Sequence, residues 1–294
     1  DTDPMEKERG ITIFSKQAVL PLETVELTLL DTPGHVDFSA EMERTLSVLD
    51  CAILVVSGSD GVQGHTHTLW RLLERYQVPT FLFINKMDLP GADRGELLAR
   101  LREQLDEGCA DFLDRPALYE QAALCDEGLL EDYLEHGSVP DAALTALIAQ
   151  RKLFPCWFGS ALRLEGVADF LQGLEQYAPR PVYPAHFGAR IFKISRDEQG
   201  ARLAWMKITG GSLKVKTLLE GPGWQDKADQ LRVYSGRKFQ LAEEAPAGST
   251  VAVTGLSAAA AGQGLGFEGE GPPPTLTPVL TYRVELPEGQ DPET

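Results

Sequence analysis

Two short, unbroken apolar runs constrain the fold of this chain more than any other feature. Residues 52–56 (Ala-Ile-Leu-Val-Val) and 80–84 (Thr-Phe-Leu-Phe-Ile) each have the length of a strand that is buried on both faces. Residues 68–76, between them, have a helical apolar pattern. A strand, a helix and a second strand with short connections predict an α/β domain built on a parallel sheet.

The flanking sequence extends this prediction. Alternating apolar residues lead to a turn at Pro21, and residues 25–30 predict a second strand that stops at Asp31. Residues 38–49 predict a helix, residues 153–158 resume the sheet, and residues 167–177 predict a closing helix.

Residues 93–151 have almost no strand pattern and predict a helical insertion. Between Glu103 and Asp141 the insertion has twelve carboxylates and one basic residue, Arg115. Such a run is usually a solvated face, and the alternative is a docking surface for a basic partner.

The second half of the chain begins after a stiff, proline-rich linker at residues 179–184. Residues 185–277 predict a small antiparallel β-barrel, because short strands of period two alternate with glycine turns. The predicted strands are 189–194, 203–208, 215–219, 231–233 and 251–253. Residues 258–271 predict a loop, and residues 278–294 predict the start of a third domain with a strand at 278–286.

Charge and composition exclude several classes of protein. The formal net charge is −17, which argues against a stand-alone nucleic-acid-binding protein. The four cysteines form neither a disulfide framework nor a CxxC metal motif. No apolar run is long enough to span a membrane, and no signal peptide is recognisable, so we expect a cytoplasmic monomer without membrane contact.

The segment Asp31-Thr32-Pro33-Gly34-His35 follows a predicted strand. A carboxylate at the end of a buried strand is placed to hold Mg²⁺ through water, and glycine allows a backbone N–H to approach a phosphate. His35 is suited to orient an attacking water. Alone, the segment also fits a type I turn.

Asn85-Lys86-Met87-Asp88 follows the strand predicted at residues 80–84. A carboxylate accepts two hydrogen bonds, which suits the adjacent N–H and NH₂ donors of guanine and not adenine. Gly159-Ser160-Ala161-Leu162 follows a further strand, where Ser160 and the N–H groups after it are placed to meet guanine O6. Together the three segments predict a P-loop-type GTPase fold.

These motifs resemble those of a known family. Glu8-Arg9-Gly10-Ile11-Thr12-Ile13, followed by residues 31–38, resembles the switch regions of translational GTPases of the elongation factor G class. The similarity continues through residues 61–63, 84–88 and 159–161 and into the predicted barrel. The Arg202-Leu203-Ala204-Trp205 stretch and the short insertion resemble most closely the ribosomal protection proteins of tetracycline resistance.

The resemblance implies a role for each motif residue. Thr12 and Asp31 would hold Mg²⁺, Gly34 would sense the γ-phosphate, and His35 would be the catalytic residue that positions water. The ribosome, through its RNA and proteins, would be the activating partner, and GTP or GDP with Mg²⁺ the cofactors. The implied GTP-binding residues are Thr12, Asp31, Thr32, Pro33, Gly34, His35, Asn85, Lys86, Met87, Asp88, Ser160, Ala161 and Leu162.

One departure from the family pattern is large. The chain contains no G-x-x-x-x-G-K-[ST] phosphate loop and no Gly-Lys dipeptide. We therefore expect residues 1–180 to be an N-terminally incomplete GTP-binding domain, and the chain to be an internal piece of a longer protein. The alternative function is a non-hydrolysing binding module for the ribosome, RNA or protein.

Other conspicuous residues have simpler interpretations. His65 and His67 are expected at the surface or at a helix start. Trp70, Trp157 and Trp205 are expected in the core. For Arg232, Arg237 and Lys238, contact with RNA phosphates and a solvated strand face remain open alternatives.

Overall fold

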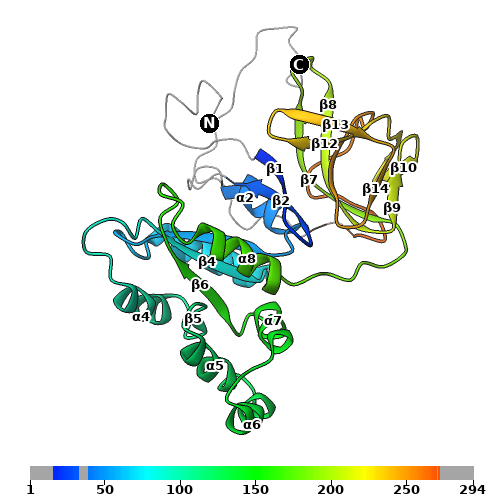
Figure 1. Cartoon of the computed structure of the whole chain (residues 1–294). Helices are drawn as coiled ribbons and strands as arrows, with labels where there is room; N and C mark the ends of the chain where they lie inside the picture. Colours follow the sequence, from blue (N-terminus) through cyan, green and yellow to red (C-terminus); the bar gives the residue numbers. More distant parts are fainter. Residues whose placement is uncertain (1–15, 33–38, 270, 272–294) are drawn as a thin grey trace.

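The computed structural model describes residues 16–32, 39–269 and 271 (Figure 1). Its central sheet has four parallel strands in the order β3-β4-β6-β5. The strands are β3 (Ala52–Ser57), β4 (Thr80–Asn85), β5 (Cys109–Asp111) and β6 (Phe154–Phe158). The helices described are α2 (Ser39–Leu46), α3 (Gly64–Arg75), α4 (Arg94–Gln104), α5 (Arg115–Ala123), α6 (Glu127–His136), α7 (Asp141–Ala149) and α8 (Val167–Tyr177).

The apolar run of β4 is buried on both faces, as its unbroken pattern predicts. Phe81 and Phe83 contribute to the core that contains Phe170 of α8, whereas Leu82 and Ile84 contribute to the core that contains Trp70 of α3. Covering both faces of the sheet confirms the α/β prediction for this half.

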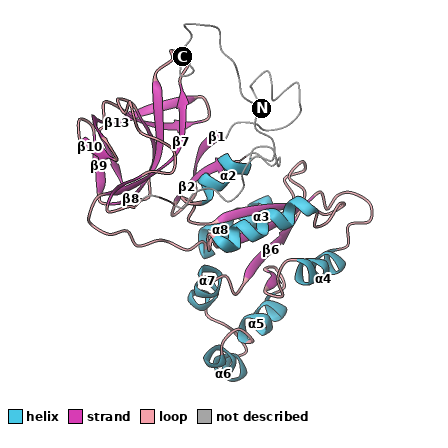
Figure 2. Ribbon diagram, turned by 180° about the vertical axis from the view of Figure 1, so that it is seen from behind, coloured by secondary structure: helices cyan, strands magenta, loops and turns pink. Residues whose placement is uncertain are grey.

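Part of the segment at residues 93–151, which the sequence predicted to be a helical insertion, belongs to the central α/β domain. Leu97 and Leu101 of α4 belong to the core beneath the sheet, and β5 pairs in parallel with β6. The prediction of an all-helical segment was wrong at β5, because three residues are too few to produce a strand pattern. Helices α5, α6 and α7 form an extension at one end of the sheet (Figure 2).

Two helix boundaries also differ from the sequence prediction. The helix predicted at 38–49 ends at Leu46, because the chain turns through residues 47–48 before Ala52 starts β3. The helix predicted at 68–76 begins four residues earlier, at Gly64.

A two-stranded antiparallel hairpin lies beside the central sheet and is separate from it. It consists of β1 (Lys16–Pro21) and β2 (Glu26–Asp31), and β2 pairs with β1 alone among the described strands. In the same way, β4 is the one strand with which β3 pairs in the described part of the chain, so that within this part each sheet has an unpaired edge on this side.

An apolar groove lies between these two free edges. It has a volume of about 200 Å³ and is lined by side chains of β2, α2, β3, α3 and α8. Beside it, Ile53 is 37% exposed and Val55 is 58% exposed, although both lie in a strand of the central sheet. The expectation that residues 52–56 form a strand buried on both faces is therefore wrong at Ile53 and Val55, because the described residues leave the face of β3 that carries these two side chains partly uncovered.

The second half is an antiparallel β-domain made of strands β7 to β16. Its largest sheet has the order β13-β12-β15-β8-β7-β16, and two smaller sheets pair β14 with β9 and β10 with β11. The strands are β7 (Gly188–Arg196), β8 (Arg202–Gly210), β9 (Ser212–Lys214), β10 (Leu218–Gly221), β11 (Trp224–Lys227), β12 (Leu231–Ser235), β13 (Lys238–Ala242), β14 (Glu244–Pro246), β15 (Thr250–Val253) and β16 (Gly264–Gly266). The antiparallel prediction is confirmed, while the third domain predicted from residue 278 lies outside the described residues.

Several details of this domain correct the sequence prediction. Of the strand predicted at 215–219, only residues 218 and 219 are in a strand, β10. Residues 215–217 form the connection from β9, because Lys216 adopts a left-handed backbone with φ of 66°. The loop predicted at 258–271 contains β16, which pairs with β7.

Candidate nucleotide-binding site

Asn85, the last residue of β4, joins two loops at the carboxyl edge of the central sheet. Its side-chain Oδ1 accepts hydrogen bonds from the N–H of Lys86 and the N–H of Ala161, both at 2.8 Å. The N–H of Met87 also donates to the carbonyl of Gly159 at 3.0 Å. The structure therefore brings the 85–88 and 159–162 motifs together, although 76 positions separate Asn85 from Ala161.

Asp88 is held from two sides. Its carboxylate is 11% exposed, and Arg163 Nε lies 3.4 Å from its Oδ2. A hydrogen bond from the Ser160 side chain, assisted by the Arg163 charge, holds the pKa of Asp88 below its usual range. The group is therefore an ionised acceptor at neutral pH, as the reading of guanine requires.

The 160–165 loop is closed on itself, and this fixes Ser160. Ser160 is 1% exposed, and its backbone N–H and C=O both bond to Glu165 at 3.0 Å. A Cβ on Gly159 would lie 2.2 Å from the Glu165 carbonyl, so only glycine fits there. Within the described residues the N–H of Leu162 has no acceptor, and the Leu162 side chain is 90% exposed.

Lys86 is at the rim of the site. Its backbone is left-handed, with φ of 65°, and its Nζ lies 3.9 Å from Asp60 in the loop after β3. The aliphatic stem is thereby displayed on the same edge as Asp88, where it is placed to cover a flat base.

Asp31 and Thr32 are placed differently from the prediction. Asp31 ends β2 and is exposed, and β2 is a half-exposed strand of the separate hairpin. The expectation that Asp31 ends a buried strand of the same sheet as Asn85 was wrong. The physical reason is that the groove, and no strand among the described residues, lies between β2 and β3.

Four of the predicted site residues lie outside the described residues. They are Thr12, Pro33, Gly34 and His35. The structure therefore positions the base-recognition residues and Asp31 but does not report on the predicted γ-phosphate, water and threonine contacts.

The other conspicuous residues divide by burial. Trp70 and Trp157 are buried, as predicted. Trp205 is not in the core of the β-domain: it is half-exposed, and its Nε1 donates to Ser195 at 2.8 Å. His65 and His67 lie in the first turns of α3.

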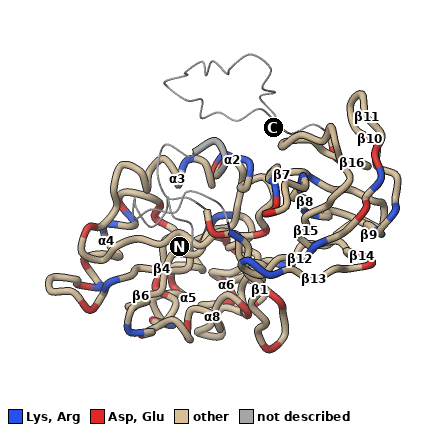
Figure 3. Tube along the Cα trace, turned by 90° about the horizontal axis from the view of Figure 1, so that it is seen from above, with Lys and Arg blue, Asp and Glu red and all other residues tan. Residues whose placement is uncertain are grey.

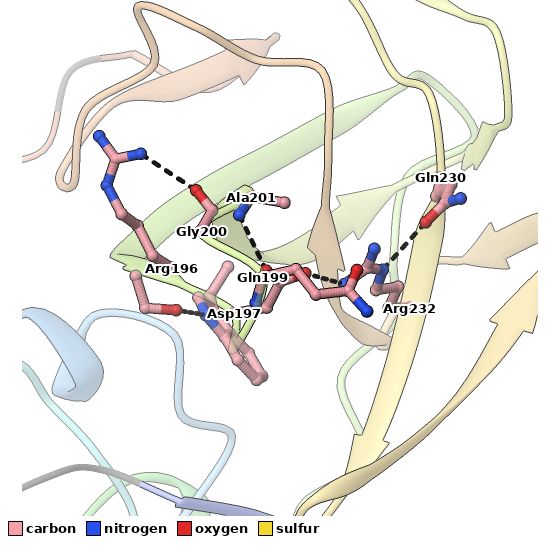
Figure 4. A network of polar contacts seen from close by, with 9 residues as sticks. Arg196, Asp197, Gln199, Gly200, Ala201, Gln230 and Arg232 are labelled. Atoms are coloured by element: carbon pink, nitrogen blue, oxygen red, sulfur yellow. Dashed lines mark hydrogen bonds and ion pairs between the residues drawn. The ribbon is translucent and has the colours of Figure 1, made fainter. Parts of the chain in front are cut away.

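Arg232 is engaged within the β-domain. Its guanidinium donates to Asp197 at 2.8 Å and to Gln230 at 3.0 Å, so the turn between β7 and β8 is tied to β12 (Figure 4). This network does not favour contact of Arg232 with RNA phosphates. In Figure 3 the trace carries the colour of Lys and Arg near β1, β12 and β13. Lys16 is the first residue of β1, and Arg237 and Lys238 lie at the start of β13 and in the turn before it.

No group of three or more His, Cys, Asp and Glu side chains among the described residues is arranged to hold a metal ion. No helix there combines the length and apolar character that a membrane span needs.

Sequence reasoning missed Arg163 and Asp60. Arg163 directly follows the Ser160-Ala161-Leu162 motif, but nothing in the sequence places it on Asp88. Asp60 pairs with Lys86 only because β3 and β4 are neighbours in the sheet.

Comparison with known proteins agrees with this arrangement. Residues 1–180 match the model of the elongation factor Tu GTP binding domain. Elongation factor G 1 of Geobacter sulfurreducens is 32% identical to this chain, over 87% of the chain and 48% of the relative. The oxytetracycline resistance protein of Streptomyces rimosus is 34% identical, over 74% of the chain and 37% of the relative.

The fold has a similar counterpart among solved structures. A crystal structure of a Thermus thermophilus protein matches with a TM-score of 0.83 and 25% identity, over 95% of this chain and 50% of that one. The chain thus spans about half the length of the relatives it matches. On the family match, the chain belongs to the elongation factor Tu GTP-binding domain family, and it resembles elongation factor G over most of its length.

Proposed function

We propose that this chain provides the guanine-binding half and the adjoining β-domain of a ribosome-dependent translational GTPase. The protein would act as an elongation factor G or as a ribosomal protection protein. The observation that carries the proposal is the joining of the two base-recognition loops through Asn85 Oδ1 and the Ala161 N–H, at 2.8 Å.

Three residues would each contact a different part of the base. Asp88 would accept from the N1–H and the exocyclic amine of guanine, and the free N–H of Leu162 would donate to O6. Lys86 would cover the ring. Adenine has no N1–H and presents an amine in place of O6, so the same groups would reject it.

The phosphate side would use other residues. Asp31 is an exposed carboxylate, and a hard oxygen ligand fits Mg²⁺, which Asp31 would hold with Thr12. Bound Mg²⁺ would neutralise charge on the phosphates. His35 would orient the attacking water, and Gly34 would donate its N–H to the γ-phosphate.

The apolar groove supports a further part of the proposal. Two strand edges facing one apolar groove can accept a β-strand that pairs with both of them. We propose that a strand from polypeptide outside residues 1–294 occupies this groove and carries the phosphate loop, which residues 1–294 lack. The groove opens beside Thr32, so the end of such a strand would lie near Asp31.

A second function is favoured by one observation. Without the phosphate-loop lysine, the 294-residue chain would bind a base and not hydrolyse the nucleotide, and so act as a binding module. GTP turnover by the chain with added ribosomes separates the two functions. Base binding without turnover favours the module.

The base-recognition proposal is tested by NMR titration of the 294-residue chain. Guanosine monophosphate should shift the amide signals of residues 85–88 and 160–164. Adenosine monophosphate should bind at least about tenfold more weakly, because it leaves Asp88 without donors. Equal shifts with both nucleotides would contradict the proposal.

A further inference from the structure

Two groups of polar contacts cross from the GTP-binding half to one place on the β-domain. The first is made by Lys207 on β8, whose side chain is 7% exposed. Its Nζ donates to the Val48 carbonyl at 3.0 Å and forms an ion pair with Asp50. The Tyr183 hydroxyl donates to the same Asp50 oxygen at 3.1 Å.

The second group uses the neighbouring strand. Thr250 on β15 is the register partner of Lys207, and its carbonyl accepts from Gln17 Nε2 at 3.4 Å. Gln17 lies on β1 and is 4% exposed. Its backbone carbonyl accepts a hydrogen bond from the Gly236 N–H at 2.8 Å. The Val19 N–H donates to Ser235 Oγ at 3.3 Å.

The segments held by these contacts follow the two predicted GTP-sensing motifs in the sequence. Val48 and Asp50 directly follow α2, the helix that comes after the Asp31–His35 motif. Gln17 follows Thr12 by five positions. One cross-strand pair of the β-domain therefore holds the segments that follow both predicted GTP-sensing motifs.

We propose that the Lys207–Thr250 pair is a joint that couples these two segments through the β-domain. Neighbouring residues of one ladder move together, so a displacement of the α2 side is passed to the β1 side and the reverse. The role of the joint in a GTP response rests on the proposed function. The coupling itself does not.

The packing around the joint favours coupled motion. A cavity of about 320 Å³ lies beside it, lined by residues that include Leu30, Val48, Tyr183 and Gly248. The two halves are thus held here by a few polar contacts next to a void. A buried ammonium needs its partners, so Lys207 leaves Val48 and Asp50 only when the whole joint opens.

The coupling is tested by amide hydrogen exchange in the nucleotide-free chain. Lys207→Met removes the contacts to Val48 and Asp50 and keeps the length of the side chain. We expect exchange of the Gly236 amide, which reports on the β1 side, to be at least about tenfold faster than in the wild type. The amides of the β8–β15 ladder, such as Val251, should keep their protection.

Two further variants make the result decisive. Lys214→Met is the matched control, because the Lys214 side chain is 66% exposed and forms an ion pair with Glu244 of the same domain. It should leave exchange of the Gly236 amide unchanged. Asp50→Asn weakens the joint from the other half, and it decides the outcome if Lys207→Met disturbs the β-domain. Gly236 exchange at the wild-type rate in both Asp50→Asn and Lys207→Met would overturn the joint.

The reciprocal variant tests the opposite direction. Gln17→Leu should speed exchange at the Leu49 amide, whose acceptor is the Leu46 carbonyl, although Gln17 bonds to neither residue. An unchanged Leu49 amide would show that the two contacts open independently and would also overturn the proposal. Because no nucleotide is present, failure of the proposed GTPase function leaves these results standing.

Discussion

The base side and the phosphate side of the candidate site differ in how they are built. On the base side, Asn85, Asp88 and Ser160 are fixed by hydrogen bonds between loops that end strands of one four-stranded sheet. On the phosphate side, Asp31 ends a separate hairpin that faces an apolar groove. Under the proposed function, base recognition would rest on loops that are already fixed by hydrogen bonds, whereas phosphate binding would depend on a strand that fills the groove.

The largest expected effect is the difference in free energy of unfolding between a core variant beneath α8 and a variant beside the groove. Trp157 is 2% exposed and contacts the rings of Phe112 and Phe170, with centroids 5.0 Å and 5.4 Å away. Trp157→Ala should lower the free energy of unfolding by about 3–5 kcal/mol, since it leaves a cavity beneath α8. Val55→Ala, beside the groove, should cost less than about 1 kcal/mol, because Val55 is 58% exposed. Urea unfolding measures both, and similar losses would mean that the groove edge is packed in solution.

A second prediction sharpens the base side. Asp88→Asn should move the preference from guanosine to xanthosine monophosphate by at least about tenfold, because an amide supplies a donor that faces the added oxygen of xanthine. Asp60→Asn is the matched control: Asp60 lies at the same rim, with its carboxylate 3.9 Å from Lys86 Nζ, so the preference should stay within about threefold. A preference unchanged by Asp88→Asn would refute the assignment of Asp88 as the guanine acceptor.

A third prediction concerns Arg163 and pH. The pKa of Asp88 is depressed in the folded chain, so guanine binding is present above that pKa and is lost as the pH falls through it. Arg163→Gln removes a charge that lowers the pKa, so the loss of binding should begin at a higher pH. At neutral pH the affinity should fall only about threefold, because the Arg163 side chain is 58% exposed and screened.

NMR titrations of guanosine monophosphate over a series of pH values measure this shift. Arg100→Gln is the control, since Arg100 is 55% exposed and pairs with Glu96 away from the loops. Loss of guanosine monophosphate binding at the same pH in the Arg163→Gln and wild-type chains would show that Arg163 does not act on Asp88.

The sequence predicts the base side of the candidate site better than the phosphate side. The 80–84 run and the 85–88 and 159–162 motifs were placed correctly, because strand burial and loop chemistry are local properties. Cys109–Asp111 escaped prediction because three residues are too few to produce a strand pattern. Strand β13 was also not predicted: Phe239 and Leu241 are exposed there, and the Phe239 ring contacts the ring of Tyr234 on β12, a neighbour that the sequence does not identify.

The position of Asp31 was beyond sequence reasoning for a different reason. The apolar residues of 25–30 match a buried strand, and whether that strand is buried depends on what lies in the groove beside it. The joint at Lys207 likewise depends on the docking of two halves, which no local pattern encodes.

The most direct test of the account is calorimetric titration of the 294-residue chain with guanosine monophosphate and with GDP plus Mg²⁺. Phosphates contribute most of a nucleotide's affinity through loop N–H groups, a lysine and the metal, and the phosphate loop is missing from this chain. We predict dissociation constants near 1 mM, about −4 kcal/mol, with GDP binding within about tenfold of the monophosphate. Micromolar GDP binding, far tighter than the monophosphate, would contradict the account, since it would require a complete phosphate site within residues 1–294.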